Sequence, residues 1–198
     1  FEARESETLA IVGESGCGKS LTSLAIMGLL PKNAQRTAEI LELNKEDLQE
    51  LTERQLADIR GNRMAMIFQE PMTSLNPSFT IENQLLEPLL RHKELSKADA
   101  RNKVIEMLEL VGIKPAESRL RQYPHQLSGG LRQRVMIAMS LLCNPDLIIA
   151  DEPTTALDVT IQAQILELMM GLQEKFNTGI LFITHDMGVV ATIADRVA

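Results

Sequence analysis

The sequence predicts an α/β fold in which helices cover both faces of a parallel sheet. A glycine-rich loop at residues 13 to 20 separates an apolar, strand-like run from a segment with helical spacing. In the last third of the chain, two nearly continuous apolar runs, at residues 147 to 151 and 179 to 185, flank a long helical pattern at residues 159 to 176. Strands that are apolar on both faces and alternate with helices are typical of parallel sheets.

The other elements follow from apolar spacing and from the residues that end each run. Pro31 ends the first helical pattern, and Gly112 ends an amphipathic helix that begins near residue 98. The expected elements are, in chain order, a strand at 8 to 13, a helix at 19 to 30, a weak helix at 45 to 60, a strand at 64 to 68, a mostly helical stretch at 71 to 144 and a helix at 186 to 198.

Length, charge and cysteine content limit the classes of protein to consider. A chain of 198 residues suffices for one domain, which we expect to have a core at 1 to 70 and 145 to 198 and a helical subdomain at about 71 to 144. The net charge of −7 argues against nucleic acid as a partner, because such binding relies on clustered Lys and Arg. The two cysteines, Cys17 and Cys143, have no metal-ligand spacing and predict neither a disulfide nor a zinc site, in keeping with a reducing cytosol.

The composition, 44% hydrophobic and 24% charged residues, is that of an ordinary globular protein. No apolar run reaches the roughly 20 residues that span a bilayer, so we expect no membrane insertion. The chain starts and stops abruptly, and its end falls within an expected helix. We therefore expect it to be part of a longer protein, truncated at both ends.

The first glycine-rich loop, GESGCGKS, matches the phosphate-binding pattern G-x-x-x-x-G-K-[ST] between a strand and a helix. Backbone N–H groups of the loop and the helix N-terminus attract phosphate, Lys19 would reach the β and γ oxygens, and Ser20 would ligate Mg²⁺. A glycine-rich turn with a chance lysine is the plain alternative, and the side chain of Cys17 is expected to be incidental. The expected nucleotide contacts are Gly13, Glu14, Ser15, Gly16, Cys17, Gly18, Lys19, Ser20 and Leu21.

Two acidic residues stand at the end of a buried strand. Asp151 is expected to help hold Mg²⁺, and Glu152 to orient or polarise the water that attacks the phosphate. Gln69 and His185 follow two other strands, and we expect them at the same sheet edge as the glycine-rich loop, because α/β sheets bind ligands at the carboxyl ends of strands. For each of these residues the alternative is a solvated turn or a surface polar side chain.

A second glycine-rich stretch, formed by Ser128, Gly129 and Gly130, precedes another helical pattern. It also presents N–H groups at a helix N-terminus, but it has no lysine and no metal ligand. Such a loop would complete a site whose other half is the first loop. If one chain keeps the two loops apart, two chains must face each other head to tail. An ordinary Ser-Gly-Gly helix cap is the alternative, and His125 is expected to be a turn residue.

In order and in rough spacing, the motifs together resemble those of the ATP-binding cassette (ABC) ATPases over the whole chain. The motifs are GESGCGKS, Gln69 in IFQEP, LSGGLRQR, LIIADEP, ALD at 156 to 158 and FITH. The LSGG pattern separates this family from other P-loop proteins. Longer stretches such as MIFQEPMTSLNP and YPHQLSGG resemble the ATPases of bacterial peptide and nickel importers, including those for dipeptides, oligopeptides and glutathione.

The resemblance implies a P-loop NTPase fold, ATP and Mg²⁺ as ligands, and ATP hydrolysis coupled to import. The subunit would lie at the cytoplasmic face of the bacterial inner membrane, with a second nucleotide-binding domain, two membrane permeases and an extracytoplasmic substrate-binding protein as partners. Gln69 would sense and help hold Mg²⁺ and water, and His185 would act as a γ-phosphate switch; with Glu152 they form the expected catalytic set. The LSGG loop would donate to the partner's γ-phosphate, and Asp158 would form a contact across the dimer.

Three features depart from the family pattern. Residues 33 to 45 lack the glycine turns that the resemblance leads us to expect in a small antiparallel sheet. The aromatic residue that stacks on adenine in this family would precede Phe1, and Leu131 stands where the LSGG motif is often followed by Gln. Two other classes stay open, a cassette ATPase of DNA repair or chromosome maintenance and a P-loop kinase. Gln69 and Ser128 are only 59 positions apart, too few for the coiled-coil insertion of the first class, and a kinase would leave the LSGG loop unexplained. The ATPase does not contact the cargo, so the sequence does not identify it.

Overall fold

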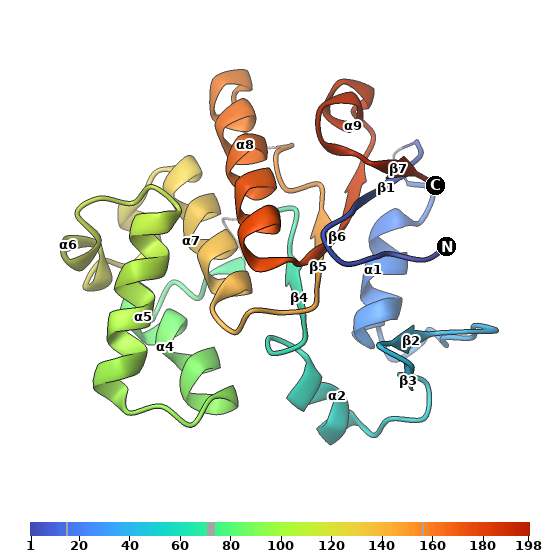
Figure 1. Ribbon diagram of the computed structural model, residues 1–198, viewed down its shortest axis with the longest axis horizontal. Coiled ribbons are helices and arrows are strands. Elements are labelled where there is room, and N and C mark those ends of the chain that lie inside the picture. The colour runs from blue at the N-terminus through green and yellow to red at the C-terminus, as the bar shows by residue number, and fades with distance from the viewer. Residues whose placement is uncertain (15, 71–73, 156) are drawn as a thin grey trace.

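The computed structural model describes residues 1–14, 16–70, 74–155 and 157–198. A five-stranded sheet with strand order β4-β5-β6-β1-β7 lies at the centre (Figure 1). All of its neighbouring strands are parallel, so the predicted α/β class is confirmed. The strands are β1 (Thr8–Val12), β4 (Met64–Ile67), β5 (Leu147–Asp151), β6 (Gly179–Thr184) and β7 (Arg196–Val197).

Helices cover both faces of this sheet. Figure 1 shows α7 and α8 on one side of the strands and α1 on the other. The helices are α1 (Lys19–Met27), α2 (Glu53–Ile59), α4 (Ile81–His92), α5 (Lys97–Leu110), α6 (Ala116–Leu120), the 3-10 helix η1 (Pro124–Gln126), α7 (Gly129–Leu141), α8 (Val159–Phe176) and α9 (Met187–Ile193). The expectation that residues 71 to 144 are mostly helical is therefore confirmed for the described part of that stretch.

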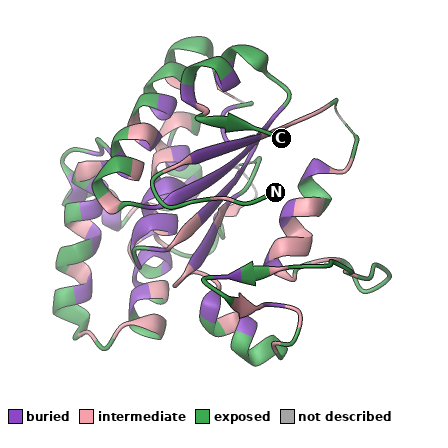
Figure 2. Ribbon diagram, turned by 45° about the vertical axis from the view of Figure 1, so that its right-hand side comes forward, coloured by how far each residue is buried: buried purple, intermediate pink, exposed green. Residues whose placement is uncertain are grey.

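Apolar residues on the two faces of the sheet form two separate cores. Ile148 and Phe182 belong to the core with α7 and α8, whereas Ile149 and Leu181 pack in a second core with Met27 of α1. Successive residues of a strand point to opposite faces, so β5 and β6 must be apolar at nearly every position. Figure 2 shows these strands buried along almost their whole length.

A bundle of four helices, α4 to α7, packs beside the sheet in the larger core. Leu85, Leu89, Leu108 and Leu120 are completely buried there. The Thr80 hydroxyl caps α4, and the side chain of Ser96 caps α5 in the same way. That this bundle forms a subdomain distinct from the core at 1 to 70 and 145 to 198 stays a prediction.

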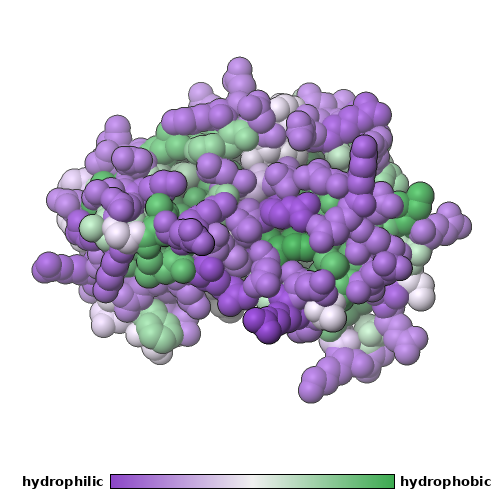
Figure 3. Space-filling model, turned by 60° about the horizontal axis from the view of Figure 1, so that its bottom comes forward, coloured by the Kyte–Doolittle hydropathy of each residue, from purple (hydrophilic) through white to green (hydrophobic). Residues whose placement is uncertain are grey.

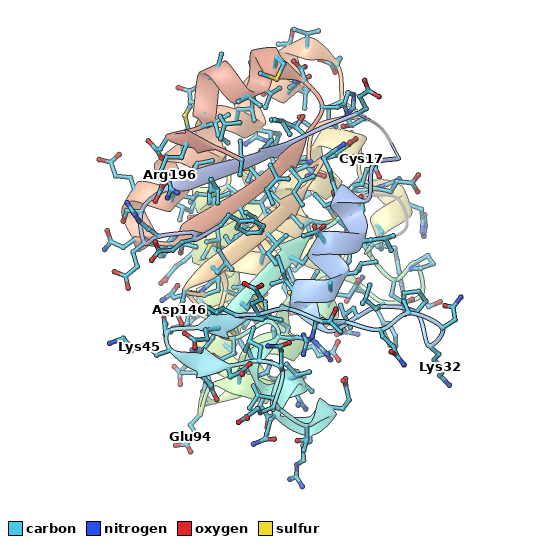
Figure 4. All side chains as sticks on the ribbon, turned by 90° about the vertical axis from the view of Figure 1, so that its right-hand side faces the viewer. Cys17, Lys32, Lys45, Glu94, Asp146 and Arg196 are labelled. Carbon is cyan, nitrogen blue, oxygen red and sulfur yellow. The ribbon has the colours of Figure 1, made fainter. Side chains whose placement is uncertain are left out.

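β2 (Glu42–Leu43) and β3 (Glu46–Asp47) form an antiparallel hairpin that contains no glycine. Its two turn residues, Asn44 and Lys45, have positive φ values of 51° and 70°, which is the pattern of a type I′ turn. Asn tolerates this conformation, and the Asn44 amide donates a hydrogen bond to Asp146 (2.9 Å). Figure 4 shows Lys45 and Asp146 at the same end of the molecule. Asn and a tertiary hydrogen bond thus replace the glycine turns that the sequence lacks.

The weak helix predicted at 45 to 60 is wrong in its first half. The helix that forms, α2, begins only after Thr52. The N–H of Gln55 donates to the Thr52 hydroxyl (3.4 Å), and the N–H of Thr52 donates to the side chain of Gln55 (2.9 Å). This reciprocal capping box determines where the helix starts.

The helix predicted at 186 to 198 is wrong in its second half. α9 ends at Ile193, the backbone of the next residue, Ala194, is extended, and β7 then pairs with β1. The N–H of Thr8 donates to the carboxylate of Asp195 (2.8 Å), and the N–H of Asp195 donates to the carbonyl of Thr8 (3.0 Å). The edge of β1 offers backbone partners that would stay unpaired if the helix continued.

Polar residues dominate the face of the molecule in Figure 3, with smaller apolar patches between them. Within the described ranges, no helix has both the length and the apolar character needed to cross a membrane. Neither cysteine is in a disulfide: Cys17 is exposed and Cys143 is buried.

Replacing Lys45 with Gly should stabilise the protein, because Gly adopts positive φ without steric cost and completes an Asn-Gly type I′ turn. The free energy of unfolding should rise by about 0.5 to 1 kcal/mol, since the larger chain entropy of glycine offsets part of the strain that is removed. Urea unfolding followed by circular dichroism measures the change. Asn44→Gly is the matched control: it loses the hydrogen bond to Asp146 and should stabilise less. A lower free energy of unfolding for Lys45→Gly would contradict this account of the turn.

Candidate functional site

The first glycine-rich loop joins β1 to α1 at the carboxyl edge of the sheet. Gly16 and Gly18 have φ values of 84° and 98°, and Gly18 stands at the N-cap of α1. A Cβ built on either residue meets nothing within 4 Å among the described residues, so the backbone conformation rather than crowding requires glycine here. Figure 4 shows Cys17 of this loop at the opposite end of the sheet from Asp146. Ser15, one of the predicted contacts, lies outside the described residues.

The side chain of Lys19 folds back onto the loop and is nearly buried. Its Nζ donates to the carbonyl oxygens of Gly13 (2.7 Å) and Glu14 (2.8 Å), and the Cys17 sulfur, a weak acceptor, is 3.8 Å away. An ammonium has three N–H donors, so one remains for a stronger acceptor. The first turn of α1, which includes Leu21, has no side-chain cap and no acidic residue. Donors and positive charge are thus concentrated at this helix start.

Asp151 and Ser20 form a polar pair beneath the loop. Asp151 is 4% exposed, and its Oδ1 has no hydrogen-bond partner among the residues that the structure describes. Burial raises the pKa of Asp151 above its ordinary value and the charge of Glu152 adds to this, whereas the hydrogen bond with Ser20 and the charge of Lys19 oppose it. A buried carboxylate oxygen beside a hydroxyl suits a hard divalent cation such as Mg²⁺. In the described ranges, no group of three His, Cys, Asp or Glu side chains is arranged to hold a metal ion, so phosphate and water would supply the remaining ligands.

The three residues predicted as catalytic come together at the ends of adjacent strands. His185 Nδ1 lies 2.9 Å from Glu152 Oε1, and Gln69 Nε2 donates to Glu152 Oε2 (3.1 Å). β5 lies between β4 and β6 in the sheet, so the residue after β5 is within reach of both neighbours. The structure therefore brings Gln69 and His185 together on the carboxylate of Glu152.

Glu152 has an unusual backbone conformation and a carboxyl group whose pKa is lowered by its neighbours. Its φ of 46° is unusual for a residue other than glycine, and its N–H donates to the carbonyl of Ile183 on β6 (2.9 Å). Burial raises the pKa of Glu152, but the hydrogen bonds with His185 and Thr155 and the electrostatic effect of His185 and Lys19 outweigh burial, so that the pKa is lowered. The carboxylate is thus ionised at neutral pH and able to accept a proton or orient a water molecule.

Sequence analysis missed Thr155. Its hydroxyl donates to Glu152 Oε2 (3.0 Å), and its N–H donates to the Glu152 carbonyl (3.3 Å). The turn formed by the second bond brings the hydroxyl back onto the carboxylate. The only signal in the sequence was a hydroxyl residue three positions after the acid, which is too common to single out.

The second glycine-rich loop lies away from the first. The Ser128 hydroxyl caps α7 by accepting from the N–H of Leu131 (3.4 Å). A Cβ on Gly130 would approach Ile161 of α8 to 3.0 Å, so the loop packs tightly against that helix, with Gly129 beside it. Figure 1 shows α7 and α1 far apart, with α8 and the sheet between them. One chain therefore does not bring its two glycine-rich loops together.

Asp158 and His125 both have local structural roles. The carboxylate of Asp158 caps α8 by accepting from the N–H of Ile161 (3.0 Å), a role that sequence analysis did not predict. The next residue, Val159, is 82% exposed, so this end of α8 faces outward. His125 lies in η1 and stacks on Tyr123, which agrees with the predicted turn position.

The chain is similar along its full length to ATP-binding proteins of peptide transport. It is 58% identical to the dipeptide transport ATP-binding protein DppD of Bacillus subtilis over 200 residues, which cover 100% of this chain and 59% of that protein. It is 55% identical to the glutathione import ATP-binding protein GsiA of Escherichia coli O157:H7, covering 100% of this chain and 33% of that protein. The chain spans about three fifths of the length of the first relative and a third of the second.

Solved structures of a cassette share the fold. The dimeric structure of MJ0796, a bacterial ABC transporter cassette, has a TM-score of 0.84 and 30% identity, covering 100% of this chain and 82% of the other. A dimeric post-hydrolysis state of MJ0796 bound to ADP and Pi has a TM-score of 0.81 and 30% identity, covering 96% of this chain and 79% of the other. The ABC transporter family itself matches residues 1–155, a range that holds both glycine-rich loops, Gln69 and Glu152 but ends before His185. The chain therefore belongs to the ABC transporter family.

Proposed function

We propose that this chain binds and hydrolyses ATP as a subunit of a bacterial importer of small peptides. The observation that carries the proposal is the convergence of three parts at one sheet edge: a phosphate-binding lysine, a buried carboxylate suited to a metal, and the ionised carboxylate of Glu152. Relatives named for dipeptide, oligopeptide and glutathione transport support the cargo class. The comparisons give no support to a role in DNA repair.

The chain's own groups would bind the nucleotide by its phosphates. The third N–H of Lys19 and the N–H groups at the start of α1 would donate to phosphate oxygens, and such charge-assisted hydrogen bonds are about twice as strong as neutral ones. Ser20, Asp151 and Gln69 would hold Mg²⁺, which when bound would neutralise charge on the β and γ phosphates.

Glu152 would orient the attacking water. Its pKa is lowered, so the carboxylate is charged and can accept a hydrogen bond from water at neutral pH. Gln69 already donates to this carboxylate and His185 is hydrogen-bonded to it, and the two side chains would in turn contact the metal site and the γ-phosphate. Bringing water, base and phosphate into one geometry is the main contribution a protein makes to phosphoryl transfer.

The separation of the two glycine-rich loops supports a site shared by two chains. Ser128, Gly129 and Gly130 would donate to a nucleotide held by the first loop of a second nucleotide-binding domain, and Asp158 would contact that domain. Dimeric cassette structures of similar fold fit this arrangement. We infer that two membrane permeases and an extracytoplasmic binding protein complete the importer, with this subunit on the cytoplasmic face of the inner membrane.

Glu152→Gln should keep ATP binding while ATP turnover falls by about two to three orders of magnitude, because a neutral amide cannot take a proton from water. Phosphate release and ATP affinity, measured on the full-length protein, give the two quantities separately. Turnover close to that of the unchanged protein would remove Glu152 from its proposed role.

Lys19→Ala should weaken ATP binding by roughly 10- to 100-fold, the usual scale for a lost charge-assisted hydrogen bond. Adenosine serves as the control ligand, because it has no phosphate and its affinity should hardly change. Calorimetry with both ligands on the full-length protein makes the comparison. Equal losses for ATP and adenosine would contradict a phosphate-binding role.

Mixing two inactive variants should restore ATP hydrolysis if each site is shared by two chains. Lys19→Ala disables every first loop and Ser128→Arg blocks every second loop, but a mixed dimer keeps one complete site out of two. With random pairing and independent sites, about a quarter of the unchanged activity should return. Each variant mixed with itself is the control, and light scattering shows whether dimers form. Mixed dimers that release no more phosphate than their parents would overturn the shared site.

A further inference from the structure

We propose that Thr155 is a positioning residue that holds the Glu152 carboxylate in the orientation needed to direct the attacking water. The inference rests on the proposed function, because it deepens the role of Glu152. The Thr155 hydroxyl donates to Glu152 Oε2 (3.0 Å). Thr155 itself is solvent-exposed, whereas the carboxylate that it contacts is nearly buried. Its hydroxyl therefore reaches inward from the surface to the catalytic carboxylate.

The hydrogen bonds to Glu152 leave little freedom for its carboxylate. Oε1 is paired with His185, and Oε2 accepts from both Gln69 and Thr155. An ionised carboxylate has about four lone-pair directions, so these three contacts leave roughly one direction for water. Removing any contact allows the carboxylate to turn, and the remaining acceptor direction turns with it.

Thr155 differs from Gln69 and His185, because no contact with the metal or the nucleotide is proposed for it. Gln69 is expected to turn to the metal and His185 to the γ-phosphate, and each would then weaken its bond to Glu152. The Thr155 hydroxyl, in contrast, contacts only the carboxylate among the hydrogen bonds of the described residues. It is thus the contact that would persist when nucleotide is bound.

The backbone around Glu152 favours this contact. The N–H of Glu152 donates a hydrogen bond to the carbonyl of Ile183 on β6, and the N–H of Thr155 donates one to the carbonyl of Glu152. Both residues are therefore fixed relative to the sheet. A β-branched side chain has few χ1 rotamers, which keeps the hydroxyl near the carboxylate. The positive φ of Glu152 is the kind of constrained conformation found at sites where geometry matters.

The test compares variants in the full-length protein assembled with its transporter partners, by kcat and KM for ATP hydrolysis. Thr155→Val keeps the shape but loses the hydroxyl, and kcat should fall on the order of tenfold while KM changes little, because only the orientation of the base is lost. Thr155→Ser retains the hydroxyl and should keep most of kcat. Thr154→Val is the matched control at the neighbouring buried threonine, whose side chain forms no hydrogen bond among the described residues, and its kcat should be unchanged. If Thr155→Val does not fold, Thr155→Ala is judged by the same criteria.

A double-mutant cycle separates positioning from a general structural role. In a Glu152→Ala background, Thr155→Val should have no further effect on the residual rate, because the group that it orients is gone. A normal kcat for Thr155→Val, an equal loss for Thr155→Ser, or an undiminished effect in the Glu152→Ala background would overturn the proposal. The Glu152→Gln variant distinguishes failure of the positioning role of Thr155 from failure of the proposed role of Glu152. If it is slow while Thr155→Val is normal, only the positioning role fails; if it is as fast as the unchanged protein, the proposed role of Glu152 fails as well.

Discussion

The carboxylate of Glu152 connects three segments of the chain that are far apart in sequence. It accepts or shares hydrogen bonds with Gln69 after β4, His185 after β6 and Thr155 on its own turn. These contacts require β5 to lie between β4 and β6 with the carboxyl ends level, and the parallel register provides this. The two apolar cores on either face of the sheet hold the strands in that register, so packing far from the site sets the geometry of the carboxylate.

At the carboxyl edge of the sheet, two buried polar groups lack partners that fully compensate their charge. Lys19 is almost buried and donates hydrogen bonds to neutral carbonyls rather than to a carboxylate, and within the described part of the chain Asp151 keeps one buried oxygen without a partner. Such groups lower stability, since a buried charge or polar atom without a strong partner has lost its hydration. A polyanion with a divalent cation would supply the missing partners. The cost in stability therefore lies at the site proposed to bind nucleotide, which is where natural proteins accept departures from optimal packing.

The spacing of apolar residues correctly predicted those helices and strands whose structure depends mainly on residues close by in the sequence. The strand at 147 to 151 and the helix at 159 to 176 follow directly from apolar spacing and have the expected bounds, and the strand predicted at 179 to 185 ends one residue earlier, at Thr184. The same spacing gave wrong predictions where contacts with a segment distant in sequence determine the local structure. The segment after Ile193 leaves the helical state because the edge of β1 pairs with it. The Asn44 turn forms without glycine because Asp146, about a hundred residues away, accepts its amide.

The sequence by itself determined the class of sheet, the place of the first glycine-rich loop between a strand and a helix, and the choice of Lys19, Gln69, Asp151, Glu152 and His185 as candidate site residues, because each depends on residue type and spacing along the chain. Only the tertiary structure decided that Glu152 shares hydrogen bonds with two other strand ends, that Thr155 joins them, and that the second glycine-rich loop lies on the far side of α8. The physical reason is that these relations depend on strand order and packing. Neither is encoded in the spacing of residues along any one element.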